Sequence, residues 1–321
     1  GQTHGALKAL HSLTIAHTKS TLKNGPSPTP MTLLLRHEHP YPSSMSSLIT
    51  HSTPDTRHSD DQQHQISLLF HHEADFLPPP EYLRLLSNAP NHATSRNHSV
   101  SWIVKVAVHH GFNQVTAILA VNYLDRFLAS QGFPVRAPAA VSVITWFLQG
   151  RGWAFHLVSL ACLSLAAKME ELHVPLLEDL QVLCPERVFH PKTVQRMELC
   201  VLGALKWRMR AITAFDYLSY FSKLNHRLFE AASSLIMRSL DVIELLAFSP
   251  SVLAAGAILH ARHGDENGGT CLHHSVDQDV AIRCKQILES CHSDRLTRDT
   301  DTDTHSTIFE LDEPLPKRRR L

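Results

Sequence analysis

The stretch that decides the fold is Trp153 to Glu171, WAFHLVSLACLSLAAKMEE. From Leu157 through Ala167 it contains no charged residue and no helix breaker, so a helix here is apolar on every side. Because all faces of such a helix must be covered, we expect it at the centre of a helical bundle. Lys168 suits the negative end of the helix dipole, and with the Met-Glu-Glu that follows it forms a charged rim. This rim is the first candidate site.

The composition favours a protein partner over nucleic acid or a membrane. The chain has 321 residues, of which 43% are hydrophobic and 19% charged, so a sizeable core fits. Its 30 basic and 30 acidic side chains cancel, which leaves no electrostatic footprint for nucleic acid or an acidic membrane surface. We expect no membrane-spanning run and no leader. Because the chain starts at Gly1, we expect a fragment or a translation that begins upstream of Met31.

Cysteine and histidine spacing predicts neither a disulfide framework nor a metal centre. The six cysteines have no CxxC pair, which indicates a reducing compartment. The 24 histidines raise the hypothesis of a histidine-rich metalloenzyme, but HExxH and zinc-finger spacings are absent from the sequence. We therefore expect no metal, no cofactor and no catalytic residue.

Composition divides the chain into two tails and two helical units. Residues 1–72 are rich in His, Ser, Thr and Pro, so we predict a disordered region, with SPTP at Ser27 to Pro30 as a candidate phosphorylation site. The first unit spans 73–208 and the second 209–292, followed by a disordered tail over 293–321. Apolar periodicity predicts helices over 80–88, 95–110, 115–130, 153–171, 175–183, 193–207, 214–224, 228–246, 251–260 and 280–291.

One carboxylate lies within an otherwise apolar helix. Asp125 interrupts the apolar face of the helix predicted over 115–130. A buried carboxylate is costly unless it is paired, and Arg96 on the preceding helix is an available partner. We predict an ion pair between them.

Four blocks of sequence resemble the cyclin box, in wording closest to plant D-type cyclins. They are RNHSVSWIVKV, VNYLDRFL, LVSLACLSLAAKMEE and VQRMELCVLGALKWRMRAIT, in family order, and the resemblance runs from about Glu73 to Cys291. It implies an all-α chain of tandem cyclin-fold domains, each of five helices, the first of which binds a cyclin-dependent kinase. The N-terminal and C-terminal tails lie outside the region of resemblance.

The resemblance also implies roles for individual residues. Arg96 and Asp125 match the buried ion pair of the family, and Leu157 and Trp102 match core positions. Lys168 and Glu198 match the pair that grips the kinase's movable C helix, so we expect them side by side on one outer face. Wide separation, or burial of the whole pair, would contradict that role. Further kinase contacts are expected near three leucines: Leu176, Leu177 and Leu180.

The sequence departs from the family pattern in three places. The LxCxE motif that docks retinoblastoma-type proteins is absent; LFHHE at Leu69 to Glu73 is a coincidence, so direct docking is not supported. Ser95, His98 and Ser99 weaken the apolar docking patch on the first helix. Residues 135–149, VRAPAAVSVITWFLQ, form an insertion, either a retained intron or a true surface loop.

The function implied is that of a kinase regulator, not an enzyme. The sequence has no GxGxxG, HRD or DFG block of its own. The resemblance implies a D-type cyclin that activates a cyclin-dependent kinase at the G1/S transition, with CDK inhibitors as further partners and a retinoblastoma-type protein as substrate. The alternative is a cyclin-fold adaptor of transcription-factor type that binds nucleic acid or polymerase. A basic cluster predicts nuclear import, beside a cytoplasmic pool: Lys317, Arg318, Arg319 and Arg320.

Overall fold

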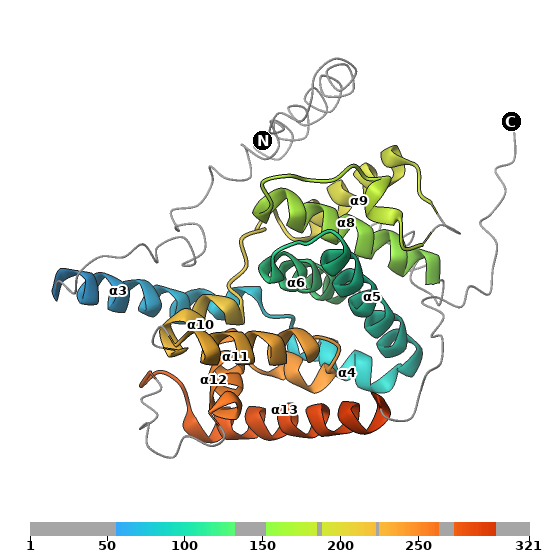
Figure 1. Ribbon diagram of the computed structural model, residues 1–321. Helices are drawn as coiled ribbons and strands as arrows, with labels where there is room; N and C mark the ends of the chain where they lie inside the picture. Colours follow the sequence, from blue (N-terminus) through green and yellow to red (C-terminus); the bar gives the residue numbers. More distant parts are fainter. Residues whose placement is uncertain (1–55, 132–151, 185–187, 223–224, 263–272, 300–321) are drawn as a thin grey trace, which may run out of the picture.

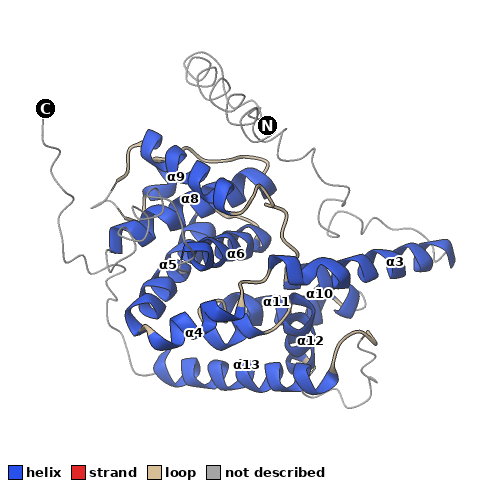
Figure 2. Ribbon diagram, turned by 180° about the vertical axis from the view of Figure 1, so that it is seen from behind, coloured by secondary structure: helices blue, strands red, loops and turns tan. Residues whose placement is uncertain are grey.

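The computed structural model describes residues 56–131, 152–184, 188–222, 225–262 and 273–299. Within these ranges all regular secondary structure is helical, as predicted (Figures 1 and 2). Three sequence features lie outside the described residues: the SPTP site, the insertion over 135–149 and the basic cluster Lys317 to Arg320.

The first helical unit is built around α8 (Gly152–Glu170), which confirms the central position predicted for this stretch. Helices α5 (Pro90–His109), α6 (Gln114–Gln131) and α9 (Pro191–Ala204) pack against it. Every side chain from Trp153 through Ala167 is buried. By length and hydropathy α8 could span a membrane, but 83% of its apolar window is buried inside the molecule, as in the core helix of a bundle.

The second unit has its own apolar core. It consists of α10 (Ala214–Ser222), α11 (His226–Arg238), the 3-10 helix η4 (Ile243–Ala247), α12 (Pro250–Ala261) and α13 (Gln278–Asp299). Helix α13 runs along one edge of this unit, and α4 (Pro80–Asn88) lies between the two units (Figure 1). Side chains from α4 join the first core, and the helix also contacts η4 of the second unit.

The prediction that residues 1–72 are disordered is wrong at its C-terminal end. Helix α3 (Thr56–His72) lies beside α10 in both views (Figures 1 and 2). Ile66 is fully buried in the second core, and Leu69 and Phe70 pack against that core. These three positions follow helical spacing, but the His, Ser and Gln residues around them lowered the local hydrophobicity.

Three predicted helices differ in the structure: one is replaced by turns, one ends early and one is divided. Over 175–183 the structure has turns and only the 3-10 helix η3 (Asp179–Gln181), because the Gln181 side chain bonds the backbone of Phe189 at 2.6 Å and 3.2 Å and closes a loop. Helix α9 stops at Ala204, since Lys206 and Trp207 adopt positive φ. The helix predicted over 228–246 divides at Ser239, whose hydroxyl donates to the Ile236 carbonyl.

The last helix extends further than predicted. The disordered tail was expected to begin at residue 293, but α13 continues to Asp299. The alternating Asp and Thr residues that indicated a flexible tail start at Asp299. The preceding residues, Ser293 to Arg298, are mostly polar in sequence, so no apolar periodicity indicated that the helix continues.

A carboxylate joins the segment after α3 to the second unit. Glu73 is buried, with 8% of the residue exposed. Its two oxygens accept hydrogen bonds from the backbone N–H of Ser251 at 2.9 Å and from the Ser251 hydroxyl at 2.8 Å. Ser251 lies in the first turn of α12, where backbone N–H groups lack helical partners. Glu73 therefore caps α12 across 178 residues of sequence. Because it belongs to this packed turn, the LFHHE stretch is structural.

Candidate functional site

The site predicted at the end of α8 is an ion pair between two helices. The ammonium group of Lys168, near the C-terminus of α8, lies 2.6 Å from Oε1 of Glu198 on α9. Ser164, one turn before Lys168 on α8, donates its hydroxyl to the same oxygen at 2.6 Å. Two donors from one face of α8 therefore converge on a single carboxylate oxygen and fix α9 against α8.

The predicted outer-face position holds for only one member of the pair. The Lys168 side chain is 18% exposed, whereas that of Glu198 is only 3% exposed. Glu198 faces the α8–α9 contact because Val194, Val201 and Leu202 turn this side of α9 toward the core. The two side chains are therefore in contact, and Lys168 remains partly accessible to solvent. An ammonium has three donor positions, and the described residues occupy one of them on Lys168.

The leucines that follow α8 differ in exposure. Leu176 is 67% exposed, and Leu172, two residues past the end of α8, is 88% exposed. Leu177 is partly buried against the first core. Leu180 is fully buried, so the prediction that it contributes to an exposed contact surface is wrong. Leu180 lies in η3, and the loop closure by Gln181 turns its side chain into the core.

A second carboxylate at the rim fixes the end of α8 to the start of α6. Glu171 Oε1 accepts a hydrogen bond from the backbone N–H of Asn113 at 2.8 Å and another from the Thr116 hydroxyl. Asn113 itself caps α6, because its side-chain oxygen accepts a hydrogen bond from the Val115 N–H at 2.9 Å. The rim of α8 is therefore held on two sides, by α6 and by α9.

The predicted pairing of Arg96 with Asp125 is present and is bidentate. The Arg96 Nε donates to Oδ1 at 2.9 Å and its Nη2 donates to Oδ2 at 2.8 Å. Tyr82 of α4 donates its hydroxyl to the same Oδ1 at 2.9 Å. Three helices, α4, α5 and α6, are thereby joined at one buried carboxylate. The fork geometry of arginine suits this position because each carboxylate oxygen receives its own donor.

Burial changes the proton affinities around this pair. Burial lowers the pKa of Arg96, but the charge of Asp125 and its hydrogen bonds outweigh that effect, so the pKa lies above its ordinary value. The pKa of Tyr82 is raised, first by burial and then by the nearby Asp125 charge. Both groups therefore remain protonated at physiological pH and keep donating to Asp125.

The two predicted core positions are confirmed as buried. Leu157 is 2% exposed and Trp102 is fully buried. The Trp102 ring meets the ring of His156 edge-on at 4.6 Å between centroids. Trp102 is thus part of the first core and offers no docking surface. Ser99, also buried, donates its hydroxyl to the Ser95 carbonyl at 2.9 Å.

The described part of the chain has no metal-binding cluster, and its two fully buried thiols are poor nucleophiles. No group of three or more His, Cys, Asp or Glu side chains there could hold a metal ion. Cys162 and Cys284 are buried free thiols, and burial raises the pKa of both. A thiol with a raised pKa forms little thiolate and is a poor nucleophile.

Sequence reasoning missed several residues that build the site. Ser164 was detectable in principle, because it lies four residues before Lys168 and so shares its helix face. Tyr82 and Glu73 gave no such signal, because their partners lie 43 and 178 residues away. Glu171 belongs to the predicted rim, but its partner Asn113, 58 residues away, was not predicted. Only the tertiary fold brings them together.

Comparison with known proteins agrees with this architecture. Residues 64–210 match the family described as "Cyclin, N-terminal domain", and residues 212–308 match "Cyclin, C-terminal domain". The fold is also similar to that of a viral cyclin from herpesvirus saimiri, with a TM-score of 0.50 and 21% identity over 63% of this chain and 85% of the viral one. This likeness concerns the fold alone.

Plant proteins give higher identities. Cyclin-D2-1 of Oryza sativa subsp. japonica is 41% identical over 189 residues, which cover 59% of this chain and 55% of that protein. Cyclin-D4-1 of Arabidopsis thaliana is 38% identical over 237 residues, 69% of this chain and 72% of that protein. The chain therefore spans little more than half of the first relative. With both cyclin domains matched and these relatives in common, the chain belongs to the cyclin family, among the plant D-type cyclins.

Proposed function

We propose that this chain is a regulatory subunit that binds and activates a cyclin-dependent serine/threonine kinase. Its membership of the plant D-type cyclins supports this function. The names of these relatives do not support the alternative, a cyclin-fold adaptor of transcription-factor type. The chain also has no net excess of positive charge with which to bind nucleic acid. The chain itself performs no chemistry in this proposal.

The geometry of the Lys168–Glu198 pair is the observation that carries the proposal. The ammonium is part-exposed at the end of a rigid core helix, and two of its donor positions are not used by any residue that the structure describes. Exposed Leu176 and Leu172 follow it in the chain and supply apolar area near the same helix end. A cation beside apolar surface fits the C-terminal carbonyls and apolar side of a partner helix. The kinase is activated if this surface binds its active conformation more tightly than its inactive one.

A kinase is active when its strand lysine pairs with a glutamate of its C helix. A rigid surface that binds the inward position of that helix more tightly than the outward one shifts the population toward the active form. Rigidity is provided here by α8, which is buried along its length and held at its end by Glu171 and Glu198. The regulator thereby stabilises one conformation of its partner.

The more detailed role is part of the same proposal. We infer action at the G1/S transition, a retinoblastoma-type protein as substrate of the complex, and CDK inhibitors as further partners. Direct docking through LxCxE is not included, since the motif is absent from the sequence. A nuclear location, beside a cytoplasmic pool, is supported by the basic cluster Lys317 to Arg320.

Co-purification with a tagged plant cyclin-dependent kinase catalytic subunit tests the proposal. The wild-type chain should be retained, and a double variant, Lys168→Met with Glu198→Leu, should be lost. Lys105→Ala is the matched control, because Lys105 is an exposed lysine on α5. Retention of the double variant at the wild-type level would refute the assigned contact, and failure of the folded wild-type chain to bind any tested catalytic subunit would refute the function.

A further inference from the structure

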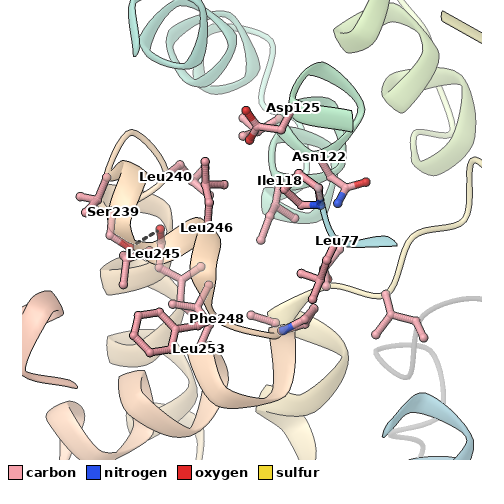
Figure 3. A pocket seen from close by; sticks show the side chains of 18 of the residues that line it. Leu77, Ile118, Asn122, Asp125, Ser239, Leu240, Leu245, Leu246, Phe248 and Leu253 are labelled. Carbon is pink, nitrogen blue, oxygen red and sulfur yellow. Dashed lines mark hydrogen bonds between the residues drawn. The ribbon is translucent and has the colours of Figure 1, made fainter. Parts of the chain in front are cut away.

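A cavity of about 110 Å³ lies at the seam between the two cyclin domains. Figure 3 shows Ile118 and Asn122 of α6 with Leu77 on one side, and Leu240, Leu245 and Leu246 on the other. The first side belongs to the N-terminal domain together with the segment before α4, and the second to the α11–η4 region of the C-terminal domain. A molecule in this cavity would contact both domains.

Most of the cavity wall is apolar, and one end is charged. Phe248 and Leu253 extend the apolar wall on the side of the C-terminal domain. At the other end lie Arg96 and Asp125, whose side chains are almost fully buried. Among the described residues, Asp125 Oδ2 accepts one hydrogen bond, from Arg96, and so retains acceptor capacity. The cavity therefore combines a mainly apolar wall with a few polar groups, among them the buried Asp125 carboxylate.

The size and the mainly apolar wall of the cavity favour a small, uncharged ligand. A cavity of about 150 Å³ with an apolar wall stays dry and binds benzene, whereas a buried water needs about two to four polar partners. Here the polar side chains are few, and they are spread around the wall: Asn122, Thr213 and Ser239 beside the Arg96–Asp125 pair. An anionic ligand is disfavoured because the free acceptor is itself a carboxylate. Leu77, Leu246 and Leu253 are only half-buried, which leaves a route of entry.

We propose that this seam cavity is a binding site for a small neutral aromatic molecule of benzene to phenol size. The ring contacts the apolar wall from both domains, and a ring hydroxyl, where present, donates to Asp125 Oδ2. Because the ligand touches both domains only in their observed arrangement, its binding stabilises that arrangement. The site is independent of the Lys168–Glu198 pair, so it can be tested without a kinase.

The test is a ligand titration of the full chain, followed by thermal unfolding. Benzene and phenol are the probes, with cyclohexanecarboxylate as the anionic comparison. At about ten times its Kd a bound probe should raise Tm by roughly 3 to 6 °C. Leu246→Trp fills the cavity from a half-buried position and should abolish the rise for both probes. Ile282→Trp, at a position 45% exposed on α13, is the matched control and should keep it.

Phenol and benzene differ by one hydroxyl, so their affinities test the contact with Asp125. Phenol should bind more tightly than benzene by several fold if Asp125 accepts its hydroxyl. If Leu246→Trp does not fold, Leu240→Phe fills the same wall with a smaller change. The proposal is overturned if neither probe raises Tm up to its solubility limit, if the rise persists in the filled variant, or if the anionic compound stabilises the chain equally.

Discussion

Lys168 Nζ lies 2.6 Å from Glu198 Oε1, and this contact joins the last turn of α8 to the middle of α9. With Glu198 only 3% exposed and bonded to Ser164 as well, the pair stabilises the N-terminal domain as well as marking its candidate kinase-binding face. A variant at either position therefore tests stability and partner binding together. The two effects must be separated by design.

Single and double variants of this pair should differ in stability. Lys168→Met leaves the buried Glu198 carboxylate without its cation and should cost roughly 2 to 4 kcal/mol of unfolding free energy. The double variant Lys168→Met with Glu198→Leu removes both charges, so most of that loss should be recovered. Urea unfolding of the full chain measures both. If the double variant is less stable than Lys168→Met, the unpaired Glu198 carboxylate is not the cause of the loss in the single variant.

Substitution in the Arg96–Asp125 pair should cost more stability than substitution in the Lys168–Glu198 pair. Asp125→Ala leaves a fully buried guanidinium unpaired, and we expect a loss of about 3 to 5 kcal/mol or failure to fold. Tyr82→Phe removes one hydrogen bond to the same carboxylate and should cost about 1 kcal/mol. Chemical denaturation gives both values. Equal costs for the two variants would mean that the ion pair adds little to the packing of α4, α5 and α6.

The Glu73 cap should couple the two domains. Glu73→Gln and Ser251→Ala each remove part of the contact at the start of α12, and each should cost about 1 to 3 kcal/mol. Because they act on the same contact, the double variant should lose less than the two single losses together. A double-mutant cycle by urea unfolding measures this interaction energy. Strict additivity would contradict a direct cap.

His273 should make stability depend on pH. Its ring stacks on Phe70 of α3 at 4.7 Å between centroids, and burial, followed by the neighbouring His274 charge, lowers its pKa below the ordinary 6.5. As pH falls below about 6.5, the unfolded chain takes up a proton that the folded chain does not, so stability declines until the lowered folded pKa is reached.

The measurement is Tm at about pH 7.5 and pH 5.5 for three chains. His273→Leu should show a smaller decrease than the wild type, because it lacks this proton uptake. His226→Gln, at a position where the side chain is 86% exposed, should behave like the wild type. An unchanged pH slope in His273→Leu would remove His273 as the cause.

The sequence predicted the elements whose signal is local. The unbroken apolar run Leu157 to Ala167 has one solution, a central helix, and α8 is that helix. Asp125 within an apolar face demanded a partner, and Arg96 provides it. The Lys168–Glu198 contact came from family resemblance, since nothing in their separation of 30 residues predicts it.

The structural features that the sequence did not predict depend on tertiary contacts. The large apolar residues of α3 are four, Ile66 and Leu68 to Phe70, near its C-terminal end. The second core that covers Ile66, Leu69 and Phe70 is not visible in the sequence of α3 itself. Leu180 carries the same local pattern as Leu176, yet the bonds from Gln181 to Phe189 bury one and leave the other exposed. At such positions burial depends on contacts with residues elsewhere in the chain, and the local spacing of apolar residues does not predict these contacts.

The most direct test of the central claim is the rate at which a plant cyclin-dependent kinase catalytic subunit phosphorylates a peptide substrate, with and without this chain. Wild-type chain and the Lys105→Ala control should raise that rate by at least about tenfold, as expected when binding shifts the kinase from a minor to a dominant active population. The Lys168→Met, Glu198→Leu double variant, shown by unfolding to be folded, should leave the rate at its basal value. Full activation by the double variant, or no activation by the folded wild-type chain, would contradict the account.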